Sequence, residues 1–276
     1  MQKIKISLII VCLSFLSLNA ARLVTVGGSI TETAIALGHQ KDLVGIDLSS
    51  VYPKHIVQDI PKIGYWLQLP KEGILSLKPN IVIASKKSKP KEFLNVLPEY
   101  GISTYFIDDE ASIQSAKNKI MQVALALNEK EKAQKIIQRI EKNLNLLNTQ
   151  MPILEVKPKV LYIFNRKNGM MMAAGAKTKA GMMIKLAGGI NALESKQFTT
   201  ISEESILKMN PDVIIFSKKN AKENLDNHII LSTSAGKNKQ IYNMDMLLIS
   251  GFTVRIDKAL NDLTCMLHKY ELSSCK

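Results

Sequence analysis

A helix followed by a strand occurs twice in this chain, and this repeat constrains the fold more than any other feature. Residues 72–83 (Glu-Gly-Ile-Leu-Ser-Leu-Lys-Pro-Asn-Ile-Val-Ile) align without a gap on residues 204–215 (Glu-Ser-Ile-Leu-Lys-Met-Asn-Pro-Asp-Val-Ile-Ile). Apolar helix-plus-strand patterns recur easily, but a shared Glu and a shared Pro in register do not, so the match indicates two similar lobes. In each copy the Pro ends a short helix, and the apolar run after it is typical of a buried strand.

Strands and helices alternate around both copies. Strands are predicted at residues 23–26, 43–46, 81–84, 104–107, 160–164, 213–216 and 240–244, with helices at 179–186 and 256–270 among those between and after them. Alternating strands and helices indicate parallel sheets, and therefore an α/β fold with two Rossmann-like lobes. Ser29 and Glu32 have the spacing of a capping box at the start of a helix that ends at Gly38. The Gly27-Gly28 turn before it lacks the glycine and lysine spacing of a nucleotide loop.

A tract with few helix breakers, from Ser112 to Leu147, lies between the two halves. Its second half, residues 129–147, places apolar side chains at helical spacing. These 19 residues make about 28 Å of helix. Such a helix predicts a stiff strut with little lobe closure, and packing inside one lobe is the alternative. We therefore expect an N-terminal lobe at 21–111, a helical tract at 112–150 that includes the linking helix, and a C-terminal lobe at 151–276, with a ligand cleft between the lobes.

The first 20 residues have the outline of a secretory signal peptide. Lys3 and Lys5 precede an apolar run from Ile6 to Leu18, and small residues follow at Ala20 and Ala21. The run is shorter than a membrane span needs. The pattern predicts export to the periplasm with cleavage near Ala20, and an uncleaved anchor is the alternative.

The charge and the cysteines limit the kinds of partner. The formal net charge of +13 becomes +11 without Lys3 and Lys5 (13 − 2), because residues 1–20 contain no acid. A basic surface attracts an anionic ligand or membrane, although a lysine-rich proteome explains it equally well. The lysines form no long basic block, which argues against nucleic acid. Cys265 and Cys275 are spaced to allow a disulfide in an oxidising compartment, with two free thiols as the alternative.

Several segments, in their order along the chain, resemble one family. They are residues 26–33 (Val-Gly-Gly-Ser-Ile-Thr-Glu-Thr), 63–66 (Ile-Gly-Tyr-Trp), 72–79, 186–192 (Leu-Ala-Gly-Gly-Ile-Asn-Ala) and 211–215. Together they resemble the periplasmic haem-binding proteins of ABC importers, which share a fold group with vitamin B12 and siderophore carriers.

The resemblance implies a ligand and a set of partners. The ligand is haem b in its ferric form, carried for iron uptake to an inner-membrane ABC permease and its ATPase. A TonB-dependent outer-membrane haem receptor is implied upstream. The protein would do no chemistry on its ligand and would not be an enzyme. A ferric-siderophore or cobalamin carrier of the same importer class is the alternative.

The resemblance also implies which residues hold the haem. The tyrosine of the family's Gly-Tyr loop is the axial ligand of ferric haem, which implies Tyr65 here, and a hard phenolate oxygen suits ferric iron. Arg255 matches a family arginine near that tyrosine, and its guanidinium favours the phenolate. Trp66 packs along the porphyrin or, alternatively, caps its own loop. The family commonly reads Gly-Tyr-Met-Arg, and Leu67 replaces that arginine here, so the propionate partners stay open.

The second axial position is also open. Residues 170–178 resemble the family segment that faces the cleft, but they contain no histidine. Tyr65 is therefore expected as the only protein ligand. The methionines at 170–172 are soft thioethers for which core packing is the favoured role. His228 is a distant second candidate.

Glu72 and Glu204 occupy equivalent positions in the two copies of the repeat. In related carriers one glutamate per lobe docks on arginines of the permease, and the resemblance implies this role for Glu72 and Glu204. Carboxylates a lobe apart suit a two-fold symmetric partner, where charge pairing sets orientation and encounter rate more than affinity. The alternative is two solvated acids favoured by the helix dipole.

Overall fold

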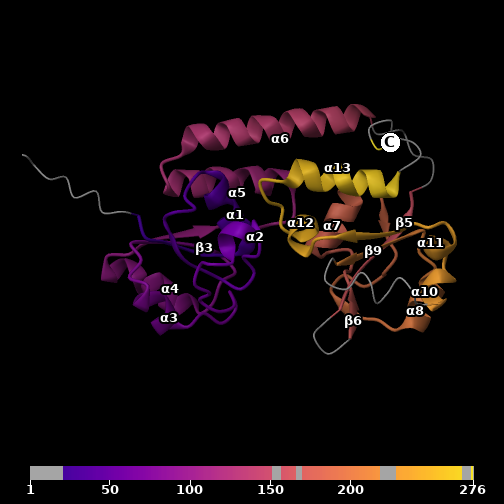
Figure 1. Ribbon diagram of the computed structural model, residues 1–276, viewed down its shortest axis with the longest axis horizontal. Helices are drawn as coiled ribbons and strands as arrows, with labels where there is room; N and C mark the ends of the chain where they lie inside the picture. The colour runs from indigo at the N-terminus through magenta and orange to yellow at the C-terminus, as the bar shows by residue number, and fades with distance from the viewer. Residues whose placement is uncertain (1–20, 151–156, 166–169, 218–227, 269–274, 276) are drawn as a thin grey trace, which may run out of the picture.

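The computed structural model describes residues 21–150, 157–165, 170–217, 228–268 and 275. Figure 1 shows two α/β lobes side by side, with the long helix α6 (Lys130–Gln150) running along one edge of both. The two-lobed α/β fold predicted from the repeat is confirmed. Within the described residues, no helix has the length and apolar character needed to cross a membrane. The predicted signal peptide, residues 1–20, lies outside the described residues.

The N-terminal lobe is built on a four-stranded parallel sheet. Its strands are β1 (Leu23–Val26), β2 (Leu43–Ile46), β3 (Ile81–Ser85) and β4 (Ser103–Ile107), in the order β2-β1-β3-β4. Leu23 lies opposite both Leu43 and Ile81, and every pairing is parallel. The strands are rich in buried apolar residues because helices cover both faces of the sheet.

Two apolar clusters show which helices cover which face of this sheet. One face packs with α1 (Gly28–Ala36) and α5 (Ile113–Ala126) in the large cluster that also reaches α6. The other face packs with α3 (Lys71–Ser76) and α4 (Lys91–Val96). The one-turn helices α2 (Lys54–Val57) and η1 (Leu97–Tyr100) complete the lobe.

The C-terminal lobe has a mixed sheet. Its strands are β5 (Lys159–Asn165), β6 (Met171–Ala173), β7 (Ile190–Asn191), β8 (Thr199–Thr200), β9 (Val213–Ser217) and β10 (Ile241–Met244). The order is β10-β9-β5-β6-β8, and β7 pairs with the start of β5. The centre of the sheet is parallel as predicted, but β6 and β8 are antiparallel additions at its edge.

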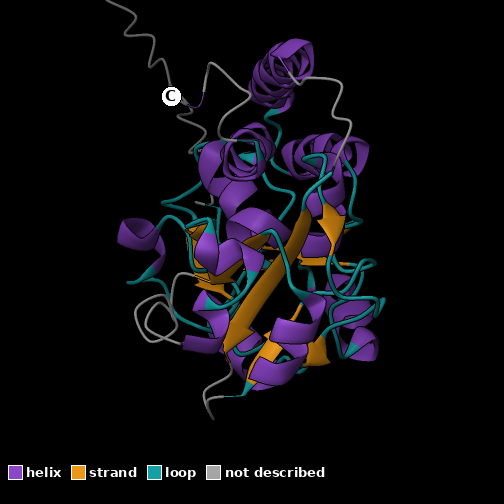
Figure 2. Ribbon diagram, turned by 90° about the vertical axis from the view of Figure 1, so that its right-hand side faces the viewer, coloured by secondary structure: helices purple, strands orange, loops and turns teal. Residues whose placement is uncertain are grey.

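Helices cover both faces of this second sheet as well. One face packs with α7 (Lys179–Leu186) and α13 (Ile256–Leu267) in the large cluster. The other packs with α8 (Glu203–Met209), α10 (His228–Leu231) and α11 (Ser234–Lys237). Figure 2, viewed from the end of the C-terminal lobe, shows the strands as a central layer between helices. The helix α12 (Met246–Ser250) leads from β10 toward α13.

Helix α6 contacts both lobes. It packs on α5 and also on α13. Arg139 donates to the carbonyl of Val254, and the amide of Asn143 donates to Asp257 Oδ2 at 2.7 Å. The predicted helix that links the two lobes is confirmed, and the small lobe closure expected from it stays a prediction. The predicted tract is two helices, however, because the chain breaks at Asn128, which has a φ of 59°.

The capping box predicted at Ser29 and Glu32 is wrong. Helix α1 begins at Gly28 with Gly27 as its N-cap, and no side chain caps its first turn. The carboxylate of Glu32 instead accepts hydrogen bonds from Thr253 and Arg255, which follow it by 221 and 223 residues. A charged, two-pronged bond to a guanidinium is stronger than a bond to one backbone amide, so the distant partner wins.

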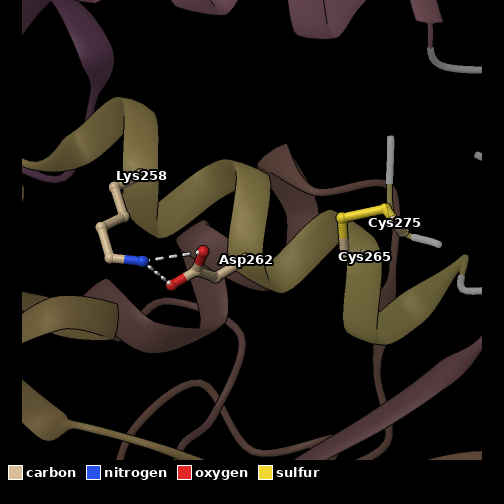
Figure 3. Close-up of a disulfide and its surroundings, with 4 residues drawn as sticks. All are labelled: Lys258, Asp262, Cys265 and Cys275. Atoms are coloured by element: carbon tan, nitrogen blue, oxygen red, sulfur yellow. Dashed lines mark hydrogen bonds and ion pairs between the residues drawn. A yellow bond between two sulfur atoms is a disulfide. The ribbon is translucent and has the colours of Figure 1, made fainter. Parts of the chain in front are cut away.

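A disulfide ties the chain end to α13. Cys265 on α13 is bonded to Cys275, with their Cα atoms 5.3 Å apart (Figure 3). The bond that the cysteine spacing allows is therefore present. The same helix carries a Lys258–Asp262 ion pair of 2.8 Å on its exposed side. Helix α13 ends at Leu267, and the last two residues of the predicted helix, 269 and 270, lie outside the described residues.

Candidate functional site

A cavity of about 1180 Å³ lies between the two lobes. Half of its lining residues lie at or just after the carboxyl ends of strands: Gly27, Gly28, Ser49, Ser50, Ser85, Lys87 and Asp109 from one lobe, and Phe164, Ser217 and residues 245–247 from the other. Open α/β sheets bind ligands at this edge, and here two such edges line one cavity. Pockets for drug-sized ligands have about 300–1,000 Å³, so this cleft suits a large ligand.

The loop that carries Tyr65 is fixed by its backbone. Gly64 has a φ of 98°, a conformation that favours glycine, and its carbonyl accepts from Leu48 N at 2.8 Å. The carbonyl of Trp66 accepts from Lys89 N at 2.8 Å. Tyr65 is 46% exposed and is not among the described residues that line the cavity, although its neighbour Trp66 is. The predicted haem ligand is therefore exposed on a loop held by backbone hydrogen bonds, and its role as a ligand stays a prediction.

Trp66 lines the cavity and also packs against the buried cluster under α3 and α4. Its ring centroid lies 5.4 Å from that of Tyr65, with the ring planes tilted by 51°. The structure thus places Trp66 where both of its expected roles, ligand wall and loop cap, are possible.

Two phenylalanines line the cavity from the other lobe. The rings of Phe164 and Phe198 meet edge to face with centroids 5.4 Å apart. Sequence reasoning missed both. Phe164 ends a predicted strand, so the carboxyl-edge rule was a usable signal. Phe198 precedes the two-residue strand β8 and carried no signal.

An ionic cluster joins the lobes at the cleft. The carboxylate of Asp109 accepts from Lys119 Nζ on α5 at 2.5 Å and from Lys179 Nζ at the start of α7. Lys119 is fully buried and also donates to the carbonyl of Gly251 at 3.1 Å. Asp109 and Lys179 line the cavity. Two ammonium groups share one carboxylate, so the cluster carries excess positive charge when both lysines are protonated.

Burial and the neighbouring charges shift the pKa values of Lys119 and Asp109 in opposite directions. Burial lowers the pKa of Lys119 from 10.5 to about 8, against the attraction of Asp109. Burial alone raises the pKa of Asp109, but the charges and hydrogen bonds of Lys119 and Lys179 outweigh it and hold that pKa below its usual value. Asp109 is therefore ionised at neutral pH.

A second ion pair crosses from α1 to the start of α13. Arg255 Nε lies 2.7 Å from Glu32 Oε1, and Nη2 lies 2.8 Å from Oε2. Thr253 Oγ1 donates to the same carboxylate at 2.7 Å, and the guanidinium carbon lies 3.5 Å from the ring centroid of Tyr52. Glu32 and Tyr52 thus fix the guanidinium in place. The role of Arg255 beside Tyr65 stays a prediction.

The backbone N–H groups of the glycine turn after β1 donate hydrogen bonds to side chains of the protein itself. Gly27 N donates to buried Asp47 at 3.0 Å, and Gly28 N donates to Ser49 Oγ at 2.9 Å. A Cβ on Gly28 would lie 2.4 Å from the Ser49 carbonyl oxygen. Glycine is needed here for close packing of two backbones, in agreement with the sequence argument against a nucleotide loop.

The candidates for the second axial position, residues 170–172 and His228, do not lie in the described lining of the cavity. Met171 belongs to β6 and packs on an apolar cluster of its lobe, and His228 is exposed at the start of α10. Residues 170–172 and the four histidines are not among the described residues that line the cavity. The described chain also contains no group of three or more His, Cys, Asp or Glu residues able to hold a metal ion.

Glu72 and Glu204 lie away from the cleft. Each is exposed in the first turn of its helix, α3 or α8. Figure 1 shows both helices on the side of the molecule opposite α6, one in each lobe. Their placement suits contact with a large partner rather than with the ligand.

Comparisons with known proteins agree with this architecture. The family model for periplasmic binding proteins matches residues 23–246. Periplasmic heme-binding protein RhuT from Roseiflexus sp. RS-1 is similar, with a TM-score of 0.80 and 30% identity over 91% of this chain and 98% of that one. Periplasmic heme-binding protein BhuT in complex with two hemes gives 0.78 and 28%, over 89% and 97%. The heme uptake protein IsdE of Staphylococcus aureus is 25% identical over 77% of this chain and 76% of that protein.

Proposed function

This chain belongs to the periplasmic binding protein family, and on that premise we propose that it binds ferric haem between its lobes and delivers it to an inner-membrane ABC permease. The observation that carries the proposal is the 30% identity to a periplasmic heme-binding protein over 91% of the chain. In this role the ligand is carried unchanged, and no enzymatic step is proposed.

The cleft suits a large, flat ligand with acidic groups. Trp66 from one lobe and the Phe164–Phe198 pair from the other supply aromatic surface for a porphyrin. Lys54, Lys62 and Lys179 line the same cavity and supply positive charge for propionates. In this proposal the lysines supply the positive charge that the family arginine, replaced here by Leu67, would otherwise provide.

Tyr65 is the proposed axial ligand of the iron. A phenolate is a hard anionic ligand for ferric iron, and the bonds that fix the loop reduce the entropy lost when the ligand binds. Arg255 stabilises the phenolate through its charge in this proposal, from the position fixed by Glu32 and Tyr52. Haem b is the expected form, because it is the haem that the family resemblance implies.

The proposed route carries haem from the outer membrane to the inner membrane. The signal peptide at 1–20, cleaved near Ala20, exports the chain to the periplasm. A TonB-dependent outer-membrane receptor supplies the haem, and the permease with its ATPase accepts it. Glu72 and Glu204 dock on cationic residues of the permease, one from each lobe.

Absorption titration with hemin tests the ligand and the role of Tyr65. We expect saturable binding and a high-spin ferric charge-transfer band typical of phenolate ligation. Tyr65→Phe removes only the hydroxyl and is expected to lose the band, whereas the exposed Tyr100→Phe keeps it. A wild-type spectrum equal to that of free hemin rules out haem, and ferric siderophores and cobalamin are then titrated against the same cleft. An unchanged band in Tyr65→Phe rules out Tyr65 alone.

A further inference from the structure

The two copies of the repeat match in exposure as well as in sequence. From Glu72 to Pro79 and from Glu204 to Pro211, each residue and its counterpart are both buried, both half-buried or both exposed. Ile74 and Ile206 are fully buried, one under each helix. Both helices also end in a left-handed residue at the equivalent position, with a φ of 46° at residue 78 and 43° at residue 210.

One apolar residue in each copy is left outside the core. Leu75 is 40% exposed and its counterpart Leu207 is 46% exposed. Each follows the exposed glutamate of its helix by three residues, which places leucine and carboxylate on the same helix face. Each lobe therefore presents an acid and a leucine on one face of a short helix, and these helices, α3 and α8, lie on the side of the molecule opposite α6 (Figure 1).

The fold itself does not require these leucines. The neighbouring isoleucines already supply the apolar contact between helix and sheet. A single exposed leucine is ordinary on a protein surface. Its recurrence beside a glutamate at the same helix position of both lobes is accounted for by a partner that contacts both lobes in the same way.

We propose that Leu75 with Glu72, and Leu207 with Glu204, form two equivalent docking patches for a two-fold symmetric membrane permease. This inference rests on the proposed function, which assigns docking to the carboxylates alone. Each half of the permease would present a cationic side chain next to an apolar recess. The leucines hold the complex by burying apolar surface, while the carboxylates steer and orient the encounter.

The two kinds of contact predict different kinetics. Loss of a leucine raises the dissociation rate, whereas loss of a carboxylate lowers the association rate and its dependence on salt. Burying the remaining exposed part of one leucine corresponds to about fivefold in affinity. The patches are on different lobes, so the two losses multiply to about 25-fold.

Biolayer interferometry on the permease–ATPase complex in lipid nanodiscs tests this, with the full mature chain at low and high salt. The variants are Leu75→Ser, Leu207→Ser and their combination, beside Glu72→Gln with Glu204→Gln. Leu125→Ser and Leu146→Ser are matched controls, because these leucines are 58% and 57% exposed on α5 and α6. A hemin titration of every variant reports that the cleft is intact.

The proposal predicts similar losses for the two single leucine variants, a larger loss for the pair, faster dissociation and unchanged hemin titration. Leucine variants that dock like wild type, beside weakened glutamate variants, overturn the proposal and leave the proposed function standing. A loss confined to one lobe overturns the two-fold character of the patches. A wild-type protein that binds hemin but not the complex rejects the docking role and this inference together.

Discussion

Replacing Lys119 with methionine is predicted to change how the stability of the protein depends on pH. Lys119 is fully buried, and burial lowers its pKa from 10.5 to about 8 in spite of the Asp109 carboxylate 2.5 Å away. The same lysine has its ordinary pKa in the unfolded chain. Between about pH 8 and 10.5 the unfolded chain therefore binds more protons, and the free energy of unfolding rises with pH.

The size of this rise follows from the shift. Lowering the pKa from 10.5 to about 8 corresponds to about 3 kcal/mol at 1.36 kcal/mol per unit. About 2 kcal/mol of that is regained between pH 7 and pH 9.5. Above about pH 10 the opposite trend begins, because burial raises the pKa of Tyr162 and the unfolded chain loses that proton first. The contribution of Lys119 to the pH dependence is therefore measured below that pH.

Urea unfolding followed by circular dichroism, at several pH values in this window, measures the effect. Wild type is expected to gain about 2 kcal/mol from pH 7 to pH 9.5, and Lys119→Met is expected to lose that gain. Lys117→Met is the matched control on the same helix, since Lys117 is less buried and pairs with Glu141 at 2.8 Å. A variant at position 119 that keeps the full rise refutes the assignment of the rise to Lys119.

Three further changes have distinct expected outcomes. Glu32→Gln leaves the partly buried charge of Arg255 without its carboxylate and is expected to cost about 3–5 kcal/mol in urea unfolding, so a cost near zero contradicts the argument. Gly28→Ala places a Cβ 2.4 Å from a backbone oxygen and should weaken hemin binding in titration, which an unchanged affinity would disprove. Serine at both Cys265 and Cys275 opens a loop with a sequence separation of 10 and should lower the free energy of unfolding by about 3 kcal/mol, whereas equal urea midpoints would show that the bond adds nothing.

The elements predicted from the sequence are those with a local pattern. Residues 179–186 form α7 with the predicted bounds, and β3 extends the predicted strand by one residue to Ser85. The strands β6 and β8 were missed because three and two residues carry no periodicity. Their existence depends on the free edge of β5, which only the assembled sheet provides.

The residues of the candidate site also fall into two groups: those marked by a pattern in the sequence, and those brought together only by the fold. Tyr65 and Trp66 were predicted because a resemblance marked their loop, and of the two only Trp66 is among the described residues that line the cleft. The ionic cluster was missed because Lys119 counts as a polar residue in any helical pattern, and only its tertiary neighbours bury it. Glu32 was wrongly assigned to a capping box because it fits that local pattern, whereas its carboxylate in fact binds the distant guanidinium of Arg255. Asp109 follows a predicted strand, so its position at the carboxyl edge was open to inference.

The arrangement of the links between the lobes bears on how a ligand is released. Helix α6 lies along one edge of both lobes, and the Glu32–Arg255 and Asp109–Lys179 ion pairs also join the two lobes. A hinge motion that opens the cleft must separate partly buried charges, which is costly. The lobes are therefore expected to bind a ligand in a preformed cleft. Helices α3 and α8, which carry the exposed acids, lie on the side of the molecule opposite α6. A permease that docks there, as proposed, would therefore act on both lobes away from the helix that joins them.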